Sequence, residues 1–152
     1  MKIDKVDRRI LRKLQENADC SIAELGASIG LSHTPCWRRI KRLREEKIIG
    51  EKVVLLDRRK LNLGVTVYAY ITIQHHDEKS LNAFETAVQK VDEIVECYSI
   101  SGDKDYALRV VVDSVEHYEQ LLKKTIVRLP NVASINSTFA LKQVKYTTRL
   151  PL

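Results

Sequence analysis

The chain has 152 residues, 44% of them hydrophobic, and its 26 Lys and Arg against 20 Asp and Glu give a formal net charge of +6. This length allows one large domain or two small ones, with enough apolar residues for a core. No apolar run approaches the roughly 20 residues of a membrane-spanning helix, and the charged start at Met1–Asp4 is unlike a secretory signal, so we expect a soluble, cytoplasmic protein.

The first predicted helix begins after Asp4, a residue type that commonly caps helices. Val6, Ile10 and Leu14 follow at a spacing of four residues, which places them on one face. The pattern predicts an amphipathic helix that packs on a partner through this face.

A second short helix is predicted to begin at Ser21. Ser21 and Glu24 have the spacing of a capping box, in which each side chain accepts a hydrogen bond from the other residue's backbone N–H. Gly30 supplies the conformational freedom that a sharp helix end requires. The apolar residues at helical spacing between them are Ile22, Leu25 and Ile29.

A third helix is predicted from 33 to 46, with Ser32 as its N-cap and Pro35 in its first turn. On a helical wheel, Arg38 and Arg42 lie almost opposite the packed face, and Trp37 lies at its edge, where we interpret it as core packing. The residues of the packed face are Cys36, Ile40 and Leu43.

Two short helices around a glycine turn, the second rich in cations, are typical of a helix-turn-helix whose second helix enters the DNA major groove. The alternative is a basic helix that is merely solvated. We favour DNA binding because the cations gather on the second helix. The candidate DNA-contacting residues are Ser32, His33, Thr34, Pro35, Arg38, Arg39, Lys41 and Arg42.

The positive charge is confined to the N-terminal part of the chain. Residues 1–60 carry 16 Lys and Arg against 9 Asp and Glu, a net +7, whereas residues 61–152 carry 10 against 11, a net −1. This asymmetry indicates a polyanion-binding module joined to a neutral one. We predict a winged-type helix-turn-helix domain over 1–47, a connector with a short strand over 48–64, and a second domain over 65–152.

The connector contains a β-like apolar run from Lys52 to Leu56, and a further short strand is predicted over Lys142–Thr147. In the second domain the hydrophobic period alternates between two and 3.6 residues, which predicts the order β-α-β-β-α-β. This is the ferredoxin-like arrangement, a four-stranded antiparallel sheet with helices on one face, so the fold class is α+β. The predicted elements are strands 65–74, 94–101, 106–112 and 132–141 and helices 78–90 and 115–129.

The first strand of this domain has one aliphatic and one polar-aromatic side. The aliphatic side fits beneath the helices, whereas Tyr68, Tyr70 and Tyr98 would lie on the opposite face of the sheet. An aromatic patch of this kind marks an interface, so we expect two copies to pair through their sheets. The alternative is a half-polar face in water.

The residues indicate neither a metal site nor an active site. Cys20, Cys36 and Cys97 lack the paired spacing of metal ligands or a disulfide framework, and we interpret Cys36 as a small buried residue rather than a redox sensor. His75 and His76 would point to opposite sides of a strand. We find no nucleophile–base pair or phosphate loop, and expect neither an enzyme nor a bound cofactor.

Four motifs together resemble the Lrp/AsnC family, the leucine-responsive and asparagine-synthetase regulators. They are D-x-x-D-R-x-I-L-x-x-L at 4–14, G-L-S-x-T-P-C-W-R-R-I-K-R-L at 30–43, D-x-x-x-L-x-L-G at 57–64 and G-D-K-D-Y at 102–106. The resemblance covers nearly the whole chain, and the C-terminal sequence is similar to a branch containing an enterobacterial cysteine-responsive activator.

The resemblance implies a nucleoid-associated transcription regulator of double-stranded DNA that forms homodimers, assembles to octamers and responds to an L-amino acid, with cysteine as one lead. An architectural DNA-binding protein without an effector is the alternative. The resemblance places the effector at Ser101, Gly102, Asp103, Asp105, Ser137 and Thr138.

The hydrogen-bonding groups of these residues suit the two charged ends of an amino acid. A carboxylate such as that of Asp105 can accept hydrogen bonds from an ammonium group, and hydroxyl and backbone N–H groups can donate to a carboxylate. A simple hairpin turn at Gly102–Asp103 is the competing interpretation.

Overall fold

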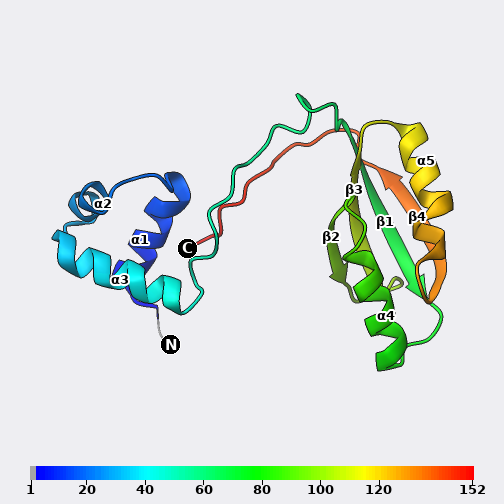
Figure 1. Cartoon of the computed structure of the whole chain (residues 1–152), viewed down its shortest axis with the longest axis horizontal. Helices are drawn as coiled ribbons and strands as arrows, with labels where there is room; N and C mark the ends of the chain where they lie inside the picture. The colour runs from blue at the N-terminus through cyan, green and yellow to red at the C-terminus, as the bar shows by residue number, and fades with distance from the viewer. Residues whose placement is uncertain (1–2) are drawn as a thin grey trace. The chain divides into compact units, whose positions relative to one another are not determined.

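The computed structural model describes residues 3–152, which form two compact units (Figure 1). One unit holds the chain up to Leu55 together with Tyr146–Leu152, and the other holds Leu56–Lys145. The first consists of helices and the second of a sheet with helices, so the predicted α+β class is confirmed.

The helical unit contains α1 (Lys5–Glu16), α2 (Ile22–Ile29) and α3 (His33–Glu45). The apolar stripes of these helices meet in one core, as the periodicity predicted. The buried hydrophobic residues are Ile10, Leu11, Leu25, Ile29, Cys36, Ile40 and Leu43.

Reciprocal capping boxes begin the first two helices. Asp4 accepts the Asp7 N–H at 2.7 Å, and Glu24 accepts the Ser21 N–H at 2.8 Å while the Ser21 hydroxyl accepts the Glu24 N–H at 3.2 Å. Ser32 occupies the N-cap position of α3, but its hydroxyl makes no capping hydrogen bond, so that part of the prediction is wrong.

The turn between α2 and α3 depends on two glycines. Gly30 has φ +70°, the left-handed conformation that ends α2. Gly26, inside α2, allows the turn to approach closely: a Cβ there would lie 2.7 Å from the Leu31 carbonyl oxygen, and the Leu31 N–H donates to the Gly26 carbonyl at 2.9 Å.

Trp37 does not enter the core, so its interpretation as core packing is wrong. Its side chain is 44% exposed, and the Lys41 ammonium lies 5.3 Å from the ring centroid. The three buried positions of α3 already fill the contact with its neighbours, so the edge of the stripe remains in water.

The C-terminal segment Tyr146–Leu152, predicted as part of the second domain, packs with the helical unit. The Leu150 backbone N–H donates to the Gln15 side chain at 2.6 Å, and the Arg12 guanidinium donates to the Leu152 carbonyl at 2.6 Å. The Leu152 side chain also packs against the helical core. Contacts between residues so distant in sequence leave no mark in local periodicity.

The sheet unit is a four-stranded antiparallel sheet in the order β2-β3-β1-β4. In the centre, Ile71 of β1 lies opposite Tyr106 of β3 and Ile135 of β4. This is the strand order of the predicted ferredoxin-like arrangement. The strands are β1 (Val65–Ile73), β2 (Ile94–Ser99), β3 (Tyr106–Val112) and β4 (Val132–Phe139).

Helices α4 (Glu78–Val88) and α5 (Val115–Lys124) cover one face of this sheet (Figure 1). The second helix is shorter than predicted, because a separate 3₁₀ turn, η1 (Ile126–Arg128), precedes Pro130. The side chains that fill the layer between sheet and helices are fully buried or nearly so. They include Val67, Ala69, Ile71, Phe84, Leu108, Val110, Val112 and Ile126.

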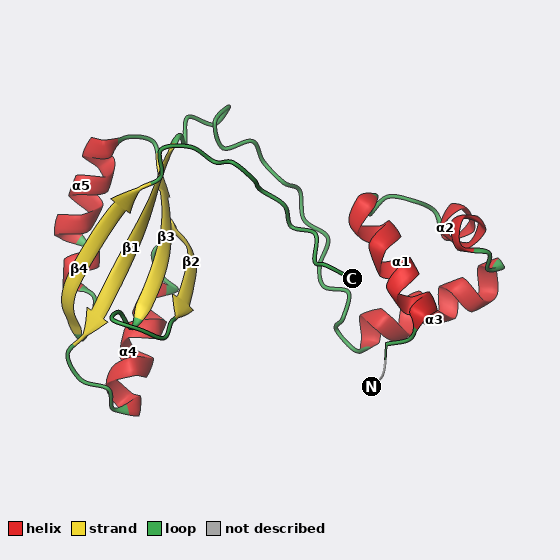
Figure 2. Cartoon of the chain, turned by 180° about the vertical axis from the view of Figure 1, so that it is seen from behind, coloured by secondary structure: helices red, strands yellow, loops and turns green. Residues whose placement is uncertain are grey.

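The other face of the sheet has no helix over it (Figure 2). Tyr68 and Tyr98 are 39% and 60% exposed on this face. Arg109 and Glu96 form a cross-strand ion pair beside them, with 2.6 Å between guanidinium nitrogen and carboxylate oxygen. The predicted division of the sheet into an aliphatic and a polar-aromatic side is therefore present.

Two predicted strands are not formed. The run Lys52–Leu56 and the segment Lys142–Thr147 are both without regular structure. Val53–Leu56 are 61% to 84% exposed. A strand needs a hydrogen-bonded neighbour, and within residues 3–152 neither segment pairs with one.

Within the described residues, no helix is long and apolar enough to cross a bilayer. The three cysteines are unpaired, and burial raises the pKa of the Cys36 and Cys97 thiols. A raised thiol pKa disfavours the reactive thiolate, which weakens the redox interpretation of Cys36.

Candidate nucleic-acid interface and effector loop

The outer surface of α3 presents cationic and small polar groups. Arg38 is exposed, and among residues 3–152 no carboxylate lies within ion-pairing distance of its guanidinium. The Lys41 ammonium lies 3.7 Å from a carboxylate oxygen of Glu45 and also lies over the Trp37 ring. The remaining exposed candidates in this region are Ser32, His33, Thr34 and Pro35.

Arg39 and Arg42 face α1 instead. The Arg39 guanidinium donates to Asp4 and Asp7 at 2.7 Å each, and Arg42 donates to the other oxygen of Asp7 at 2.6 Å. The helical wheel placed Arg42 opposite the packed face, yet its guanidinium reaches Asp7 on the neighbouring helix. The side chain is long enough to reach back to a carboxylate on the neighbouring helix.

Asp7 is the buried centre of this network, with its side chain 1% exposed between α1 and α3. Its carboxylate is satisfied by two guanidinium groups and by the Asp4 N–H. Its only signal in the sequence is weak, an Asp at the third position of a predicted helix. We call Asp4, Asp7, Arg39 and Arg42 the α1–α3 ion network.

The network shifts the titration of its exposed members. The Asp7 N–H, followed by the Arg39 guanidinium, lowers the pKa of Asp4 to about 2. The hydrogen bond to Asp4 in turn raises the pKa of Arg39. Both residues are therefore held in their charged forms at neutral pH, which keeps the ion pairs intact beneath α3.

The candidate effector loop joins β2 to β3. Ser101, Gly102 and Asp103 are exposed, and Gly102 has φ +121°. The Asp105 N–H donates to the Ile71 carbonyl at 2.9 Å, which fixes the end of the loop to β1. The loop is thus a hairpin turn with an open tip.

The Asp105 carboxylate already has two partners in the chain. One oxygen accepts the Ile73 N–H at 2.7 Å, and the other lies 2.8 Å from His76 Nε2. The Ile73 hydrogen bond, with His76 second, lowers the pKa of Asp105. In the sequence, His76 stands out only as a possible metal ligand, and its pairing with Asp105, 29 residues away, leaves no local signal.

Ser137 and Thr138 lie on β4, separated from the effector loop by β1. Their side chains point to opposite faces, because they are consecutive residues of a strand. The Ser137 hydroxyl is hydrogen-bonded to the Tyr118 hydroxyl at 2.6 Å on the helix-covered side. Within one chain the structure therefore does not gather these two residues and the loop around a single point.

Comparison with known proteins agrees with both units. The AsnC-type helix-turn-helix domain model matches residues 3–44, and the Lrp/AsnC ligand binding domain model matches residues 66–150. The DNA-binding transcriptional activator DecR of Escherichia coli K12 is 37% identical over 150 residues, which are 99% of each chain. The leucine-responsive regulatory protein of the same strain is 37% identical over 148 residues, covering 97% of this chain and 90% of that protein.

Solved structures give the same result. An AsnC family transcriptional regulator from Agrobacterium tumefaciens superposes with a TM-score of 0.92 at 43% identity, covering 97% of this chain and 96% of that one. The transcriptional regulator NMB0573 of Neisseria meningitidis, in complex with L-Met, superposes with a TM-score of 0.91 at 31% identity, covering 99% and 97%. The chain therefore belongs to the Lrp/AsnC family.

Proposed function

We propose that this chain is a sequence-specific DNA-binding transcription regulator that reads the major groove with α3. The observation that carries the proposal is the outer surface of α3, where Arg38 is exposed while Arg39 and Arg42 hold the helix against α1. A fixed helix with a protruding cation is what base readout requires. Arg39, Arg42 and Lys41 retain exposed atoms that can reach backbone phosphates.

The test is DNA binding by the Arg38→Ala variant. A binding site is first selected from random duplexes with the wild-type protein, and affinities are then measured by fluorescence titration. Arg38→Ala should weaken specific binding by about 1–3 kcal/mol and broaden the site preference. Lys13→Ala is the matched control, because Lys13 is a cation of α1 already paired with Glu16 at 2.9 Å. Equal behaviour of both variants would reject α3 as the reading helix.

The proposed effector is an L-amino acid bound near Gly102 at an interface between copies of the chain. Support comes from the open loop tip, the Asp105 carboxylate beside it and the L-Met complex of the Neisseria relative. A partner copy would supply the groups that a single chain does not gather around the loop. Cysteine, methionine and small aliphatic amino acids are the first candidates.

Thermal melting with the common L-amino acids, one at a time, tests sensing. A ligand at about 100 times its dissociation constant adds about 2.7 kcal/mol of stability, which a melting curve detects. Calorimetry on Asp105→Ala should then show a roughly tenfold or larger loss of affinity, with Asp103→Ala closer to wild type. If no amino acid shifts the melting temperature or DNA affinity, the architectural DNA-binding function is favoured.

Assembly and location follow from the same proposal. The uncovered sheet face with Tyr68 and Tyr98 supports a homodimer, and dimers assembling to octamers are the proposed higher state.

A regulator of chromosomal DNA acts in the cytoplasm, at the nucleoid. We assign the chain no catalytic role and no cofactor besides the amino-acid effector.

A further inference from the structure

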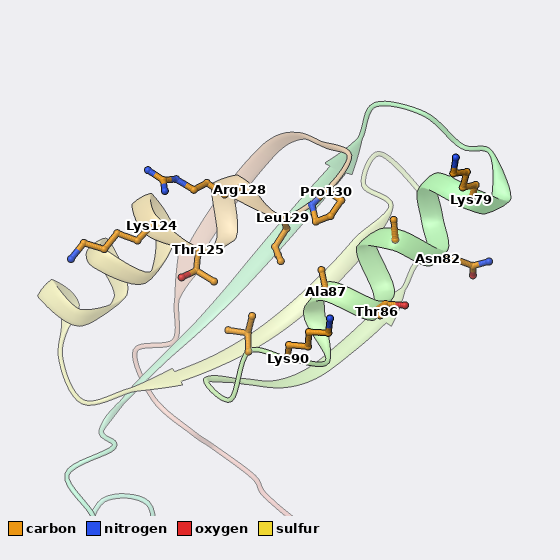
Figure 3. A pocket seen from close by; sticks show the side chains of 12 residues that line it. Lys79, Asn82, Thr86, Ala87, Lys90, Lys124, Thr125, Arg128, Leu129 and Pro130 are labelled. Carbon is orange, nitrogen blue, oxygen red and sulfur yellow. The ribbon is translucent and has the colours of Figure 1, made fainter.

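The helix-covered side of the sheet unit carries an open cavity of about 690 Å³ between α4 and the segment formed by α5 and η1. Figure 3 shows the side chains of α4 on one side and those of α5 and η1 on the other. We call this cavity the helix groove. Its lining residues are Lys79, Asn82, Ala83, Thr86, Ala87, Lys90, Val91, Lys124, Thr125, Arg128, Leu129 and Pro130.

Every charged residue that lines the helix groove is positive. Lys79 and Lys90 come from the α4 side and Lys124 and Arg128 from the other, and all four are exposed. Among residues 3–152, none of the four has a carboxylate within 4.0 Å. Neighbouring Lys123, by contrast, is paired with Glu119 and does not line the groove.

This concentration of charge is unexpected for the unit that contains it. Residues 56–145 hold 12 Lys and Arg and 12 Asp and Glu, so the sheet unit is neutral as a whole. Four like charges on two neighbouring segments repel one another, and no carboxylate among residues 3–152 pairs with any of them directly. Asn82, Thr86 and Thr125 add uncharged hydrogen-bonding groups between the cations. The groove is therefore built for an anionic ligand.

The spacing of the cations indicates a ligand with many phosphates. Lys79 lies in the first turn of α4 and Lys90 just beyond its end, and the 11 residues of α4 rise about 16 Å. A DNA strand offers one phosphate for about every 3.4 Å of helix axis, so a span of this length meets about five phosphates. A single phosphate group would engage only one end of the groove.

We propose that the helix groove binds the phosphate backbone of duplex DNA, as a second contact that carries no sequence information. The inference rests on the DNA-binding function proposed above and assigns it a second surface, outside the helix-turn-helix. Backbone contacts of this kind strengthen binding to any sequence and make it more sensitive to salt.

The test measures the affinity of the full-length protein for a random-sequence DNA duplex over a range of salt concentrations. Lys124→Ala/Arg128→Ala should reduce the slope of log affinity against log salt by about two for each protomer that engages DNA. Lys79→Ala/Lys90→Ala, on the opposite wall, should give a similar reduction. Lys123→Ala is the matched control and should keep the wild-type slope. Site preference should stay unchanged in both double variants.

Wild-type slopes in both double variants would overturn the inference, whereas failure of the wild type to bind DNA would instead reject the proposed function. A parallel melting experiment with ATP distinguishes a free polyphosphate ligand. If ATP stabilises the wild type but not Lys124→Ala/Arg128→Ala, and the DNA salt slope is unaffected, the groove is a nucleotide site and the DNA assignment is overturned.

Discussion

At the scale of single residues, Asp7 is a buried charged side chain in the helical unit, and its stability depends on its two arginine partners. Its carboxylate is buried and accepts from Arg39 and Arg42, whose side chains are 29% and 41% exposed. Breaking a buried pair by removing one partner is strongly destabilising, because it leaves the other charge without compensation. Partial exposure of the two guanidinium groups reduces that cost.

We expect Asp7→Asn to destabilise the helical unit by about 2 kcal/mol. The measurement is urea unfolding followed by the fluorescence of Trp37, the single tryptophan of the chain, which lies in this unit. Asp19→Asn is the control, since Asp19 pairs with Lys52 at the surface and its loss should cost less than about 1 kcal/mol. Similar losses in the two variants would show that burial of Asp7 contributes nothing.

The lowered pKa of Asp4 predicts that the free energy of unfolding of the helical unit depends on pH. Its pKa in the folded chain is about 2, against an ordinary value of 3.8. A lowered carboxyl pKa means that the unfolded chain binds the proton more tightly, so the stabilisation is complete above pH of about 5 and is lost as the pH falls toward 2. The difference in urea midpoint between wild type and Asp4→Asn should fall to about half by pH 3. A difference that stays constant between pH 7 and pH 3 would contradict this.

Side-chain contacts between residues distant in sequence were the hardest feature of the structure to predict from the sequence. The candidate DNA-contacting set treated Arg38, Arg39 and Arg42 alike, whereas two of them bind carboxylates 32 to 35 residues earlier in the chain. Likewise, His76 meets Asp105 only because β1 and β3 are neighbours. A helical wheel gives the direction of a side chain but not what lies in that direction.

At the scale of elements, local signals predicted most of the fold. Capping residues, glycine turns and hydrophobic periods act over fewer than ten residues, so the sequence contains all that is needed to place the helices and the four strands. The exceptions are the segments 52–56 and 142–147, where β propensity is present but the neighbouring strand is not. Strand formation depends on that neighbour, which no local pattern supplies.

The serines at the N-cap positions of α2 and α3 differ in a measurable way. Ser21→Ala removes a hydroxyl that caps α2, and should cost about 1 kcal/mol of the free energy of unfolding of the helical unit. Ser32→Ala removes a hydroxyl without a capping bond, and should change that free energy by less than about 0.5 kcal/mol. Trp37 fluorescence in urea compares the two. A larger effect for Ser32→Ala would mean that α3 is capped by its hydroxyl after all.

At the scale of the whole molecule, the uncovered sheet face predicts how copies associate. Tyr68→Lys/Tyr98→Lys would place like charges opposite one another in a sheet-to-sheet dimer, so light scattering should show a monomer where the wild type is at least dimeric. Val115→Lys is the control, because Val115 is 54% exposed at the start of α5, on the helix-covered side. A monomeric wild type would rule out this interface.

The return of Tyr146–Leu152 to the helical unit means that the polypeptide passes between the two units twice. The N-terminal 55 residues are thus connected to the rest of the chain by one covalent link, and by the hydrogen bonds that Arg12 and Gln15 make with the returning tail. A protease that cuts once within residues 56–64 would leave a nicked protein whose N-terminal fragment stays bound to the tail. A purification tag attached after Leu152 would, for the same reason, extend from a tail whose last residues are hydrogen-bonded to α1.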